Sequence, residues 1–101
     1  MTDLAALQAT LAEFRDARAW GPFHTAEALA RAVAVEAGEL NALFLWNRRP
    51  DLHRVAEEVA DVLIYGLNLC NALGFDAGQI IADKIRGNAA RPVVGDGFVK
   101  P

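Results

Sequence analysis

The sequence has one cysteine, few basic residues and no long hydrophobic run, and each shortage excludes a class of protein. Cys70 has no partner for an internal disulfide, which excludes a disulfide-stabilised scaffold. A lone thiol in an apolar run is typical of a buried core residue in a reducing compartment, so we expect a cytoplasmic protein. The formal net charge of −3 disfavours a nucleic-acid-binding surface and is too small for a disordered chain of this apolarity.

The longest segment without a charged residue, Val62 to Phe75, is shorter than the roughly 20 residues that a membrane helix needs. Asp3, Glu13 and Asp16 interrupt the beginning of the chain, so we expect neither a signal peptide nor a membrane partner. The 101 residues have room for one domain, residues 1–101. We expect its core at about residues 3–92, followed by an irregular tail.

Apolar residues, by contrast, are in excess. Twenty of the 101 residues are alanine, and 53% of the chain is hydrophobic. Counting glycine and leaving out tyrosine brings the apolar fraction to about 60%, against a typical 45–50%. This is more apolar side chain than a domain of this size easily buries. We therefore expect an interface between subunits.

The apolar residues recur with the period of a helix, which predicts an all-α protein. A first helix is expected from Asp3 to about Arg18, and Gly21 and Pro22 then break the pattern. A second helix is expected from the cap at residue 25 to about residue 46.

A short turn that ends at Pro50 separates the second helix from a third. We expect Pro50 in the first position of the third helix, Asp51 in its first turn, and Gly74 at its end. A fourth, shorter helix is expected at residues 76–88. The predicted fold is a four-helix subunit around a long antiparallel hairpin, within an oligomeric helix bundle.

Two pairs of acidic residues stand inside this hairpin. Glu36 and Glu39 lie in its first helix and Glu58 and Asp61 in its second. Members of a pair are three residues apart and share a helix face. Partners across an antiparallel hairpin have residue numbers with a constant sum, and Glu36 with Asp61 and Glu39 with Glu58 both give 97. The spacing predicts that the four carboxylates come level across the two helices.

Four clustered carboxylates need a cation or protons. Two like charges about 4 Å apart repel by roughly 4 kcal/mol at an effective dielectric constant of 20. Ligands that are all oxygens suit Mg²⁺ or Mn²⁺ rather than Zn²⁺, and such a site with open positions typically serves phosphate chemistry.

Two alternatives stand beside the metal site. The pairs could be solvated acidic patches, but Gly38 costs about 1 kcal/mol relative to alanine inside a helix, which favours close packing there. Arg54, four residues before Glu58, offers the one nearby cation. A di-iron bundle needs Glu-x-x-His motifs, and neither His24 nor His53 follows a glutamate by three residues.

Other side chains suit nucleotide binding. Trp20 and Trp46 stand at helix ends that border the acidic hairpin, where a base could stack on them or where they could form a hydrophobic plug. Phe14 and Phe44 are expected in the core, and His24 is more typical of a polar loop residue than of a catalyst. Basic residues after the acidic region suit phosphate contacts or a helix C-terminus: Lys84, Arg86 and Arg91.

The order of these residues resembles a known family. The pattern E-x-x-E, eighteen residues and E-x-x-D is similar to the signature of the MazG-type all-α nucleoside triphosphate pyrophosphohydrolases. The resemblance covers about residues 4–92 and is closest to the dCTP pyrophosphatase-like branch. The other matching segments are residues 18–20, 23–25, 40, 44–46, 57–65 and 84–85, followed by Asn88 and Arg91-Pro92.

This resemblance implies Mg²⁺-dependent hydrolysis of a nucleoside triphosphate between the α and β phosphates, with Mn²⁺ as the other candidate ion. The products would be a nucleoside monophosphate and pyrophosphate. Candidate substrates are dCTP and modified pyrimidine deoxynucleotides, although Leu11 stands where dCTP-preferring relatives tend to carry histidine. The family also implies cleansing of the nucleotide pool and a homodimer or homotetramer with sites shared between chains.

The resemblance assigns site residues by position. The metal ligands and catalytic carboxylates would be Glu36, Glu39, Glu58 and Asp61. Glu36 or Glu39 would accept the proton of the attacking water, and no covalent nucleophile would be needed. The base and sugar would contact Trp20, Phe23, His24, Trp46 and Tyr65, and the phosphates would face Lys84, Asn88 and Arg91. The alternatives are a catalytically silent helical module that binds a nucleotide or a partner, and a purely structural oligomerising bundle.

Overall fold

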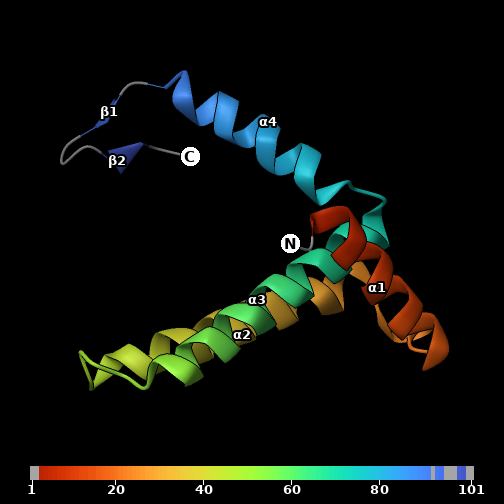
Figure 1. The fold of residues 1–101 in the computed structure, drawn as a ribbon, viewed down its shortest axis with the longest axis horizontal. Coiled ribbons are helices and arrows are strands. Elements are labelled where there is room, and N and C mark those ends of the chain that lie inside the picture. The colour runs from red at the N-terminus through yellow and green to blue at the C-terminus, as the bar shows by residue number, and fades with distance from the viewer. Residues whose placement is uncertain (1–2, 92, 95–97, 100–101) are drawn as a thin grey trace.

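The computed structural model describes residues 3–91, 93–94 and 98–99, and its long elements are helices (Figure 1). The predicted all-α class is confirmed. None of the helices in these residues is both long enough and apolar enough to cross a membrane. The elements are α1 (Leu4–Ala17), the 3₁₀ turn η1 (Gly21–Phe23), α2 (Ala26–Leu45), α3 (Leu52–Leu73), α4 (Ala77–Ala89), β1 (Val93–Val94) and β2 (Phe98–Val99).

Capping residues set most of the helix ends, as predicted at residue 25 and at Gly74. The side chains of Asp3, Thr25 and Asp76 each accept a hydrogen bond from the backbone N–H three residues later, at 2.7, 3.2 and 3.0 Å. Such bonds satisfy backbone donors that the first turn of a helix leaves unpaired. Gly74 ends α3 with a φ of 74°, in the left-handed region where glycine carries no Cβ penalty.

The start of α3 differs from the prediction. Asp51 is the cap rather than a residue of the first turn, and its carboxylate accepts a hydrogen bond from the backbone N–H of His53 at 2.9 Å. Pro50 therefore lies in the turn before the helix, where its fixed φ is equally suitable. The Asn47 side chain closes this turn by accepting a hydrogen bond from the backbone N–H of Arg49 at 2.9 Å.

The C-terminal tail, predicted to be irregular, contains a short pair of strands. β1 and β2 form an antiparallel pair, with Val93 opposite Val99 and Val94 opposite Phe98. Two β-branched or aromatic pairs on either side of Gly-Asp-Gly are a hairpin signal in the sequence. The pairs are only two residues long, so a search for longer alternation misses them. Pro92, the predicted end of the core, lies outside the described residues.

The helices are arranged around one long antiparallel hairpin, α2 with α3 (Figure 1). Helix α1 packs across α3 at the open end of this hairpin, and α4 contacts α1 and then extends away from the hairpin. The α2–α3 turn, at the far end, is free of α1 and α4 in Figure 1.

A polar clamp fixes the departure of α4. The Gln8 side chain donates to Asn71 Oδ1 at 3.0 Å and to the Phe75 carbonyl at 2.9 Å, and it accepts from the Ala77 N–H at 2.9 Å. The Asn71 amide donates in return to the Gln8 carbonyl at 3.0 Å. Because these bonds join α1 to both sides of the α3–α4 connection, they set the direction in which α4 leaves.

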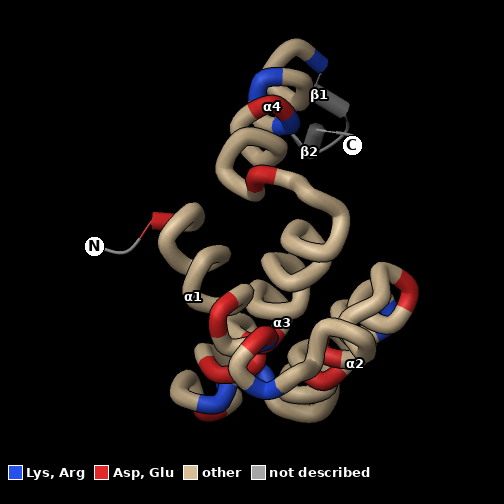
Figure 2. Tube along the Cα trace, turned by 90° about the vertical axis from the view of Figure 1, so that its right-hand side faces the viewer, with Lys and Arg blue, Asp and Glu red and all other residues tan. Residues whose placement is uncertain are grey.

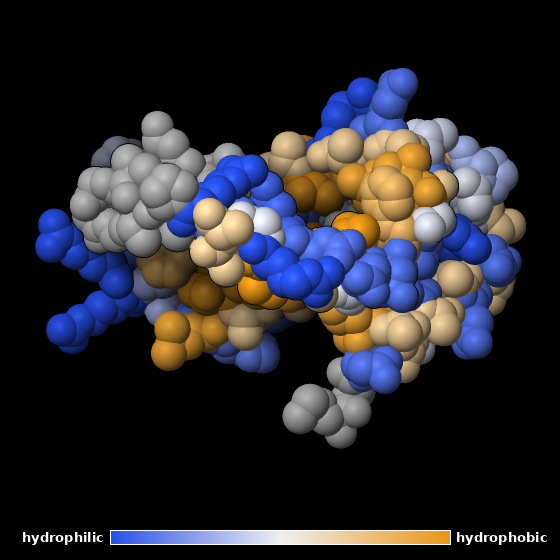
Figure 3. Space-filling view, turned by 90° about the horizontal axis from the view of Figure 1, so that it is seen from above, coloured by the Kyte–Doolittle hydropathy of each residue, from blue (hydrophilic) through white to orange (hydrophobic). Residues whose placement is uncertain are grey.

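A single chain has almost no apolar core. Leu29 and Ala77 are the buried hydrophobic residues of the described part, and many large apolar side chains are exposed (Figure 3). Phe14 and Phe44, expected in the core, are 44% and 47% exposed, and Cys70 is half-buried rather than buried. The apolar excess of the sequence is therefore left on the surface of one chain.

Candidate active site

Three of the four predicted carboxylates converge between α2 and α3. Glu36, Glu58 and Asp61 each offer one carboxylate oxygen, and these oxygens lie within 4.8 Å of one another. Glu58 and Asp61 share a face of α3 because they are three residues apart, and Glu36 faces them from the antiparallel helix. Of the two pairs predicted from the constant sum, Glu36 and Asp61 lie together in this group, whereas Glu58 is present without its predicted partner Glu39.

The fourth carboxylate, Glu39, lies at the edge of this acidic cluster. Its side chain is exposed, and it does not belong to the group whose oxygens lie within 4.8 Å. It nevertheless acts on Glu36, one turn back along α2, through its charge and hydrogen bonding. With Glu58 it also lines a cavity of about 360 Å³ that includes Arg54.

The cluster contains buried oxygens without partners. Glu36 Oε2 and Glu58 Oε2 are shielded from solvent, and no residue in the described ranges donates a hydrogen bond to either atom. Burying a carboxylate oxygen without a donor is unfavourable, because the oxygen gives up its hydration and gains nothing. A cation or a proton at this point would remove the penalty.

The pKa of Glu36 responds to this environment. Burial raises it first, the charge and hydrogen bonding of Glu39 add to the rise, and Asp61 and Glu58 contribute further, to give a pKa of about 7. The ordinary value of this group is 4.5. In the absence of a cation, the cluster therefore holds a proton on Glu36 up to about neutral pH.

An aromatic cavity of about 160 Å³ adjoins the acidic cluster. Asp61 belongs to both, since it is also one of the residues that line the cavity. Trp20 and His24 face one another there, with ring centroids 6.0 Å apart. The remaining lining residues are Leu11, Phe14, Arg15, Ile64, Tyr65 and Asn68.

The segment after α1 holds Trp20 in this cavity. Ala19 adopts a φ of 56°, which reverses the chain, and the Trp20 N–H then donates to the Arg15 carbonyl at 2.9 Å. The Trp20 ring meets Phe14 edge-on at 5.4 Å, and the Arg18 guanidinium lies 3.6 Å above the Phe14 ring. Edge-to-face and cation–π contacts of this kind fix the orientation of the indole.

Comparison with individual known proteins identifies the family, although no family model matches the sequence. The crystal structure of a pyrophosphatase from Archaeoglobus fulgidus is similar, with a TM-score of 0.74 and 36% identity over 87% of this chain and 90% of that one. The chain belongs to the MazG-type family of all-α nucleoside triphosphate pyrophosphatases.

A curated relative agrees with this family. Mouse dCTP pyrophosphatase 1 is 36% identical in an alignment 90 residues long, and the match covers 79% of this chain and 53% of the mouse protein. The chain thus spans about half the length of that relative. The family predicted from the residue pattern is confirmed.

Two of the aromatic residues that the family pattern assigns to the base lie elsewhere in one chain. Phe23 is 74% exposed and is not among the residues that line the aromatic cavity. Trp46 is 95% exposed at the end of α2. It lies ten residues beyond Glu36, or about 15 Å along the helix axis. Trp20, His24 and Tyr65 are the members of the predicted set that share the cavity.

The residues that the family pattern assigns to the phosphates lie on α4 or directly after it. Figures 1 and 2 show α4 and its basic positions away from the acidic positions of the hairpin. A single chain therefore does not bring Lys84, Asn88 or Arg91 to the acidic cluster. Asn88 Oδ1 is shielded from solvent and has no hydrogen-bond donor in the described part of the chain.

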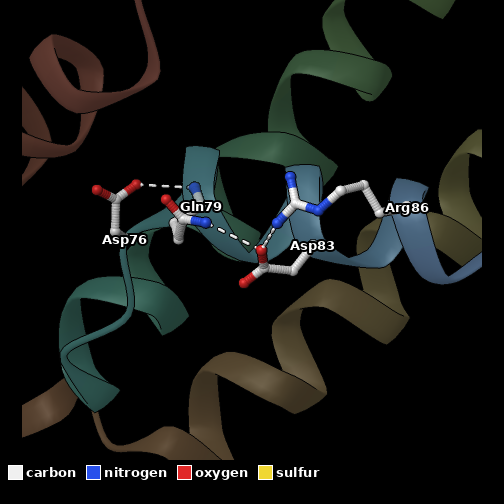
Figure 4. A network of polar contacts seen from close by, with 4 residues as sticks. All are labelled: Asp76, Gln79, Asp83 and Arg86. Atoms are coloured by element: carbon white, nitrogen blue, oxygen red, sulfur yellow. Dashed lines mark hydrogen bonds and ion pairs between the residues drawn. The ribbon is translucent and has the colours of Figure 1, made fainter.

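Arg86 is engaged on the other side of α4. Its guanidinium pairs with Asp83, which also accepts from the Gln79 side chain at 2.9 Å (Figure 4). Asp76, Gln79, Asp83 and Arg86 form one polar face of the helix, to which we refer as the α4 network face. Part of the Arg86 guanidinium is thus already paired within α4.

Three residues near the site have no assigned role in the sequence pattern. Arg15 and Asn68 line the aromatic cavity, and Arg54 lines the cavity beside Glu39 and Glu58. Helical spacing gives the signal for each. Asn68 lies seven residues after Asp61, Arg15 four after Leu11, and Arg54 four before Glu58.

Proposed function

We propose that the chain is a divalent-metal-dependent pyrophosphohydrolase that cleaves a nucleoside triphosphate into a monophosphate and pyrophosphate. The observation that carries the proposal is the convergence of Glu36, Glu58 and Asp61 within 4.8 Å, directly beside an aromatic cavity. An acidic cluster suits the metal that phosphate chemistry needs, and stacked aromatic rings suit a base. The similarity to a pyrophosphatase and to a dCTP pyrophosphatase supports the same reaction.

The residues present fit a hard divalent cation. The donor set is oxygen only, and two of its oxygens, Glu36 Oε2 and Glu58 Oε2, are buried without a partner. Glu36, Glu58 and Asp61 would hold Mg²⁺ or Mn²⁺, with Glu39 at the edge as a further ligand. The bound ion would supply positive charge to the phosphates and act as a Lewis acid.

The remaining chemistry belongs to the carboxylates. Glu39 is exposed and lies outside the tight group, so it is the better placed of the two candidate bases to accept a proton from the attacking water. Glu36, with its shielded oxygen, is better suited to hold the ion. This choice narrows the two bases that the sequence leaves open.

The two cavities give the substrate a direction. A base in the aromatic cavity would stack on Trp20 or His24, and Asp61 would bring the α phosphate to the acidic cluster. The β and γ phosphates would then extend toward the cavity lined by Glu39, Glu58 and Arg54. Arg54 makes no ion pair with any residue that the structure describes, so its guanidinium can receive a phosphate.

The substrate class proposed is a pyrimidine deoxynucleotide, dCTP or a modified form of it. A cavity of about 160 Å³ suits the smaller bases, and the mouse relative is named for dCTP. Leu11, in the cavity wall, gives the base an apolar contact where dCTP-preferring relatives tend to carry histidine. Cleansing of the nucleotide pool, in the cytoplasm, completes the proposal.

A homodimer or homotetramer is part of the same proposal. Two apolar cavities, of about 360 and 290 Å³, lie on the faces of α1, α3 and α4 and are lined almost wholly by apolar side chains. Ile80, Ile81 and Ile85 on α4 are 41%, 47% and 62% exposed. A second copy would cover these surfaces and could bring Lys84, Asn88 and Arg91 of α4, and Trp46, to a neighbouring acidic cluster.

The test is pyrophosphate release from a panel of nucleoside triphosphates and deoxynucleoside triphosphates, each with Mg²⁺ and with EDTA. We expect Mg²⁺-dependent release from pyrimidine deoxynucleotides. A thermal shift with nucleotide but no release would favour the catalytically silent binding module. Neither release nor a shift with any nucleotide would refute nucleotide chemistry altogether.

A further inference from the structure

Asn68 stands out among the residues that line the aromatic cavity. It is the buried polar residue of the described part of the chain, 9% exposed, and lies on α3. No residue of the described ranges forms a hydrogen bond with its amide. The polar atoms of this amide are nevertheless accessible from the cavity, unlike the fully shielded Oδ1 of Asn88. A buried amide is ordinarily paired, so an unpaired one that lines a cavity requires an explanation.

The position of Asn68 on α3 relates it to the reaction centre. Asp61, Tyr65 and Asn68 follow one another at spacings of four and three residues and share one helix face. Asn68 is therefore about two turns, or roughly 10 Å, from the acidic cluster along α3. A nucleotide with its α phosphate at Asp61 and its base beside Tyr65 would direct the far edge of that base toward Asn68.

We propose that Asn68 reads the Watson–Crick edge of a pyrimidine base in the aromatic cavity through two hydrogen bonds. This inference rests on the proposed function and names the residue that determines its base specificity. A primary amide presents an acceptor and a donor side by side. Cytosine presents the complementary pair, an amino donor next to a ring-nitrogen acceptor. Thymine presents the reverse pair, an oxygen acceptor next to a ring N–H donor, so it can pair only if the amide turns over.

A purely structural role for Asn68 makes a different prediction. If its amide only supported the packing of α3, its loss would lower activity on every nucleotide by the same factor. If it contacts the base, its loss removes discrimination between bases that differ at the contacted edge. Two-point contacts to a base edge typically carry 1–3 kcal/mol of discrimination, which corresponds to roughly 5- to 150-fold in kcat/KM.

The experiment compares Asn68→Leu with the wild type on dCTP, dTTP and the triphosphate of the 2-pyrimidinone deoxynucleoside, which lacks any group at position 4. Leucine has nearly the same volume but no polar atom. In the wild type, we expect kcat/KM to fall roughly 5- to 150-fold when dCTP is replaced by the pyrimidinone. In Asn68→Leu, the three substrates should differ by less than about threefold.

Two further variants complete the test. Asn68→Ser, which is polar but too short to reach the base, should behave like Asn68→Leu and covers the case in which leucine disturbs folding. Asn41→Leu makes the same exchange at an exposed position of α2 and should retain wild-type discrimination. Circular dichroism of all variants reports on the helices.

The outcomes separate this inference from the proposed function. An unchanged substrate ratio in Asn68→Leu or Asn68→Ser, or equal losses on all three nucleotides, would overturn the role of Asn68 alone. A wild type that hydrolyses the three substrates equally would overturn it as well. A wild type that releases pyrophosphate from no nucleoside triphosphate would refute the proposed function and, with it, the reading of a base by Asn68.

Discussion

The α2–α3 hairpin and helix α4 differ in how many of their side chains find partners within one chain. The hairpin brings Glu36, Glu58 and Asp61 within 4.8 Å and borders an aromatic cavity. Helix α4 has its polar contacts on the α4 network face, while its isoleucines are exposed. The difference teaches that local helix pairing builds a charged centre within one chain, whereas α4 leaves its large apolar side chains uncovered.

The largest effect is expected from the hairpin side of this comparison. Glu58→Gln keeps the volume of the side chain but removes the charge that would hold the cation. Mutation of a residue that only supports a metal ligand typically lowers metal affinity or activity by 10- to 100-fold. Loss of a ligand itself should therefore reduce pyrophosphate release by more than about 100-fold. Because like-charge repulsion is relieved, the metal-free melting temperature should not fall.

The neighbouring Glu57 offers a matched control. It is exposed and pairs with His53 at 3.4 Å, away from the cluster. Glu57→Gln should leave turnover within about twofold of the wild type. If Glu58→Gln retains more than one tenth of the wild-type turnover, the acidic cluster does not hold the catalytic ion. The hairpin would then have no larger role in the reaction than α4.

The next effect concerns the α4 arm. Ile85→Glu places a charge on a side chain that is 62% exposed in one chain and that the proposed assembly buries. Burial of an isoleucine contributes about 1.5–3 kcal/mol, so the dissociation constant of the oligomer should rise by roughly 10- to 100-fold per site. Light scattering coupled to size exclusion would measure the mass as a function of concentration.

Gln79→Glu adds the same charge on the α4 network face and should leave the oligomer intact (Figure 4). A wild type that is monomeric at all concentrations would contradict the proposed assembly. If the Ile85→Glu protein is monomeric and retains full turnover, the hairpin of one chain suffices for the reaction. The site would then not be shared between copies.

A smaller effect is expected at the outer end of the hairpin. Arg54→Gln removes a cation that lines the cavity with Glu39 and Glu58. Loss of one charge-assisted hydrogen bond should raise KM for the triphosphate by about 10-fold, because such bonds contribute roughly 1.5–3 kcal/mol. Inhibition by pyrophosphate should weaken in parallel.

Arg48→Gln, in the α2–α3 turn, changes the net charge equally and serves as the control. It should leave KM within about twofold of the wild type. If both variants raise KM by the same factor, the effect is one of overall charge, and Arg54 does not contact the phosphates.

The sequence predicts the hairpin well because its determinants are local. Capping side chains mark the starts of all four α-helices in the described residues, and Gly74 marks the end of α3. The two acidic pairs then follow from helical spacing and from the symmetry of a hairpin about its turn. The errors at Pro50 and in the tail are also local. A proline is acceptable on either side of a cap, and strands of two residues carry little periodic signal.

The surroundings of the site could not be predicted from spacing alone. The Gln8 clamp links residues more than 60 positions apart, and nothing in the sequence near Gln8 specifies Asn71 as its partner. The cavity likewise combines Trp20 from the turn after α1 with Tyr65 and Asn68 from α3. Family resemblance named Trp20, His24 and Tyr65 as candidates for base binding, but it gave no role to Asn68 or Arg54, whose positions depend on tertiary packing.

The smallest effect expected is a pH dependence of stability that originates in Glu36. Its pKa of about 7 in the folded chain exceeds the ordinary 4.5. Between these values the folded protein holds a proton that the unfolded chain has lost, so stability must fall as the pH rises through this range. The contribution is complete below about pH 4.5 and is lost above about pH 7.

In EDTA, the melting temperature of the wild type should therefore decline from pH 5 to pH 8 more steeply than that of Glu36→Gln, in which the group cannot titrate. Mg²⁺ competes with this proton, so its stabilising effect on the wild type should grow over the same range. Parallel pH curves for the two proteins would mean that Glu36 titrates normally, and that the acidic centre of the hairpin is more open to water than its two shielded oxygens indicate.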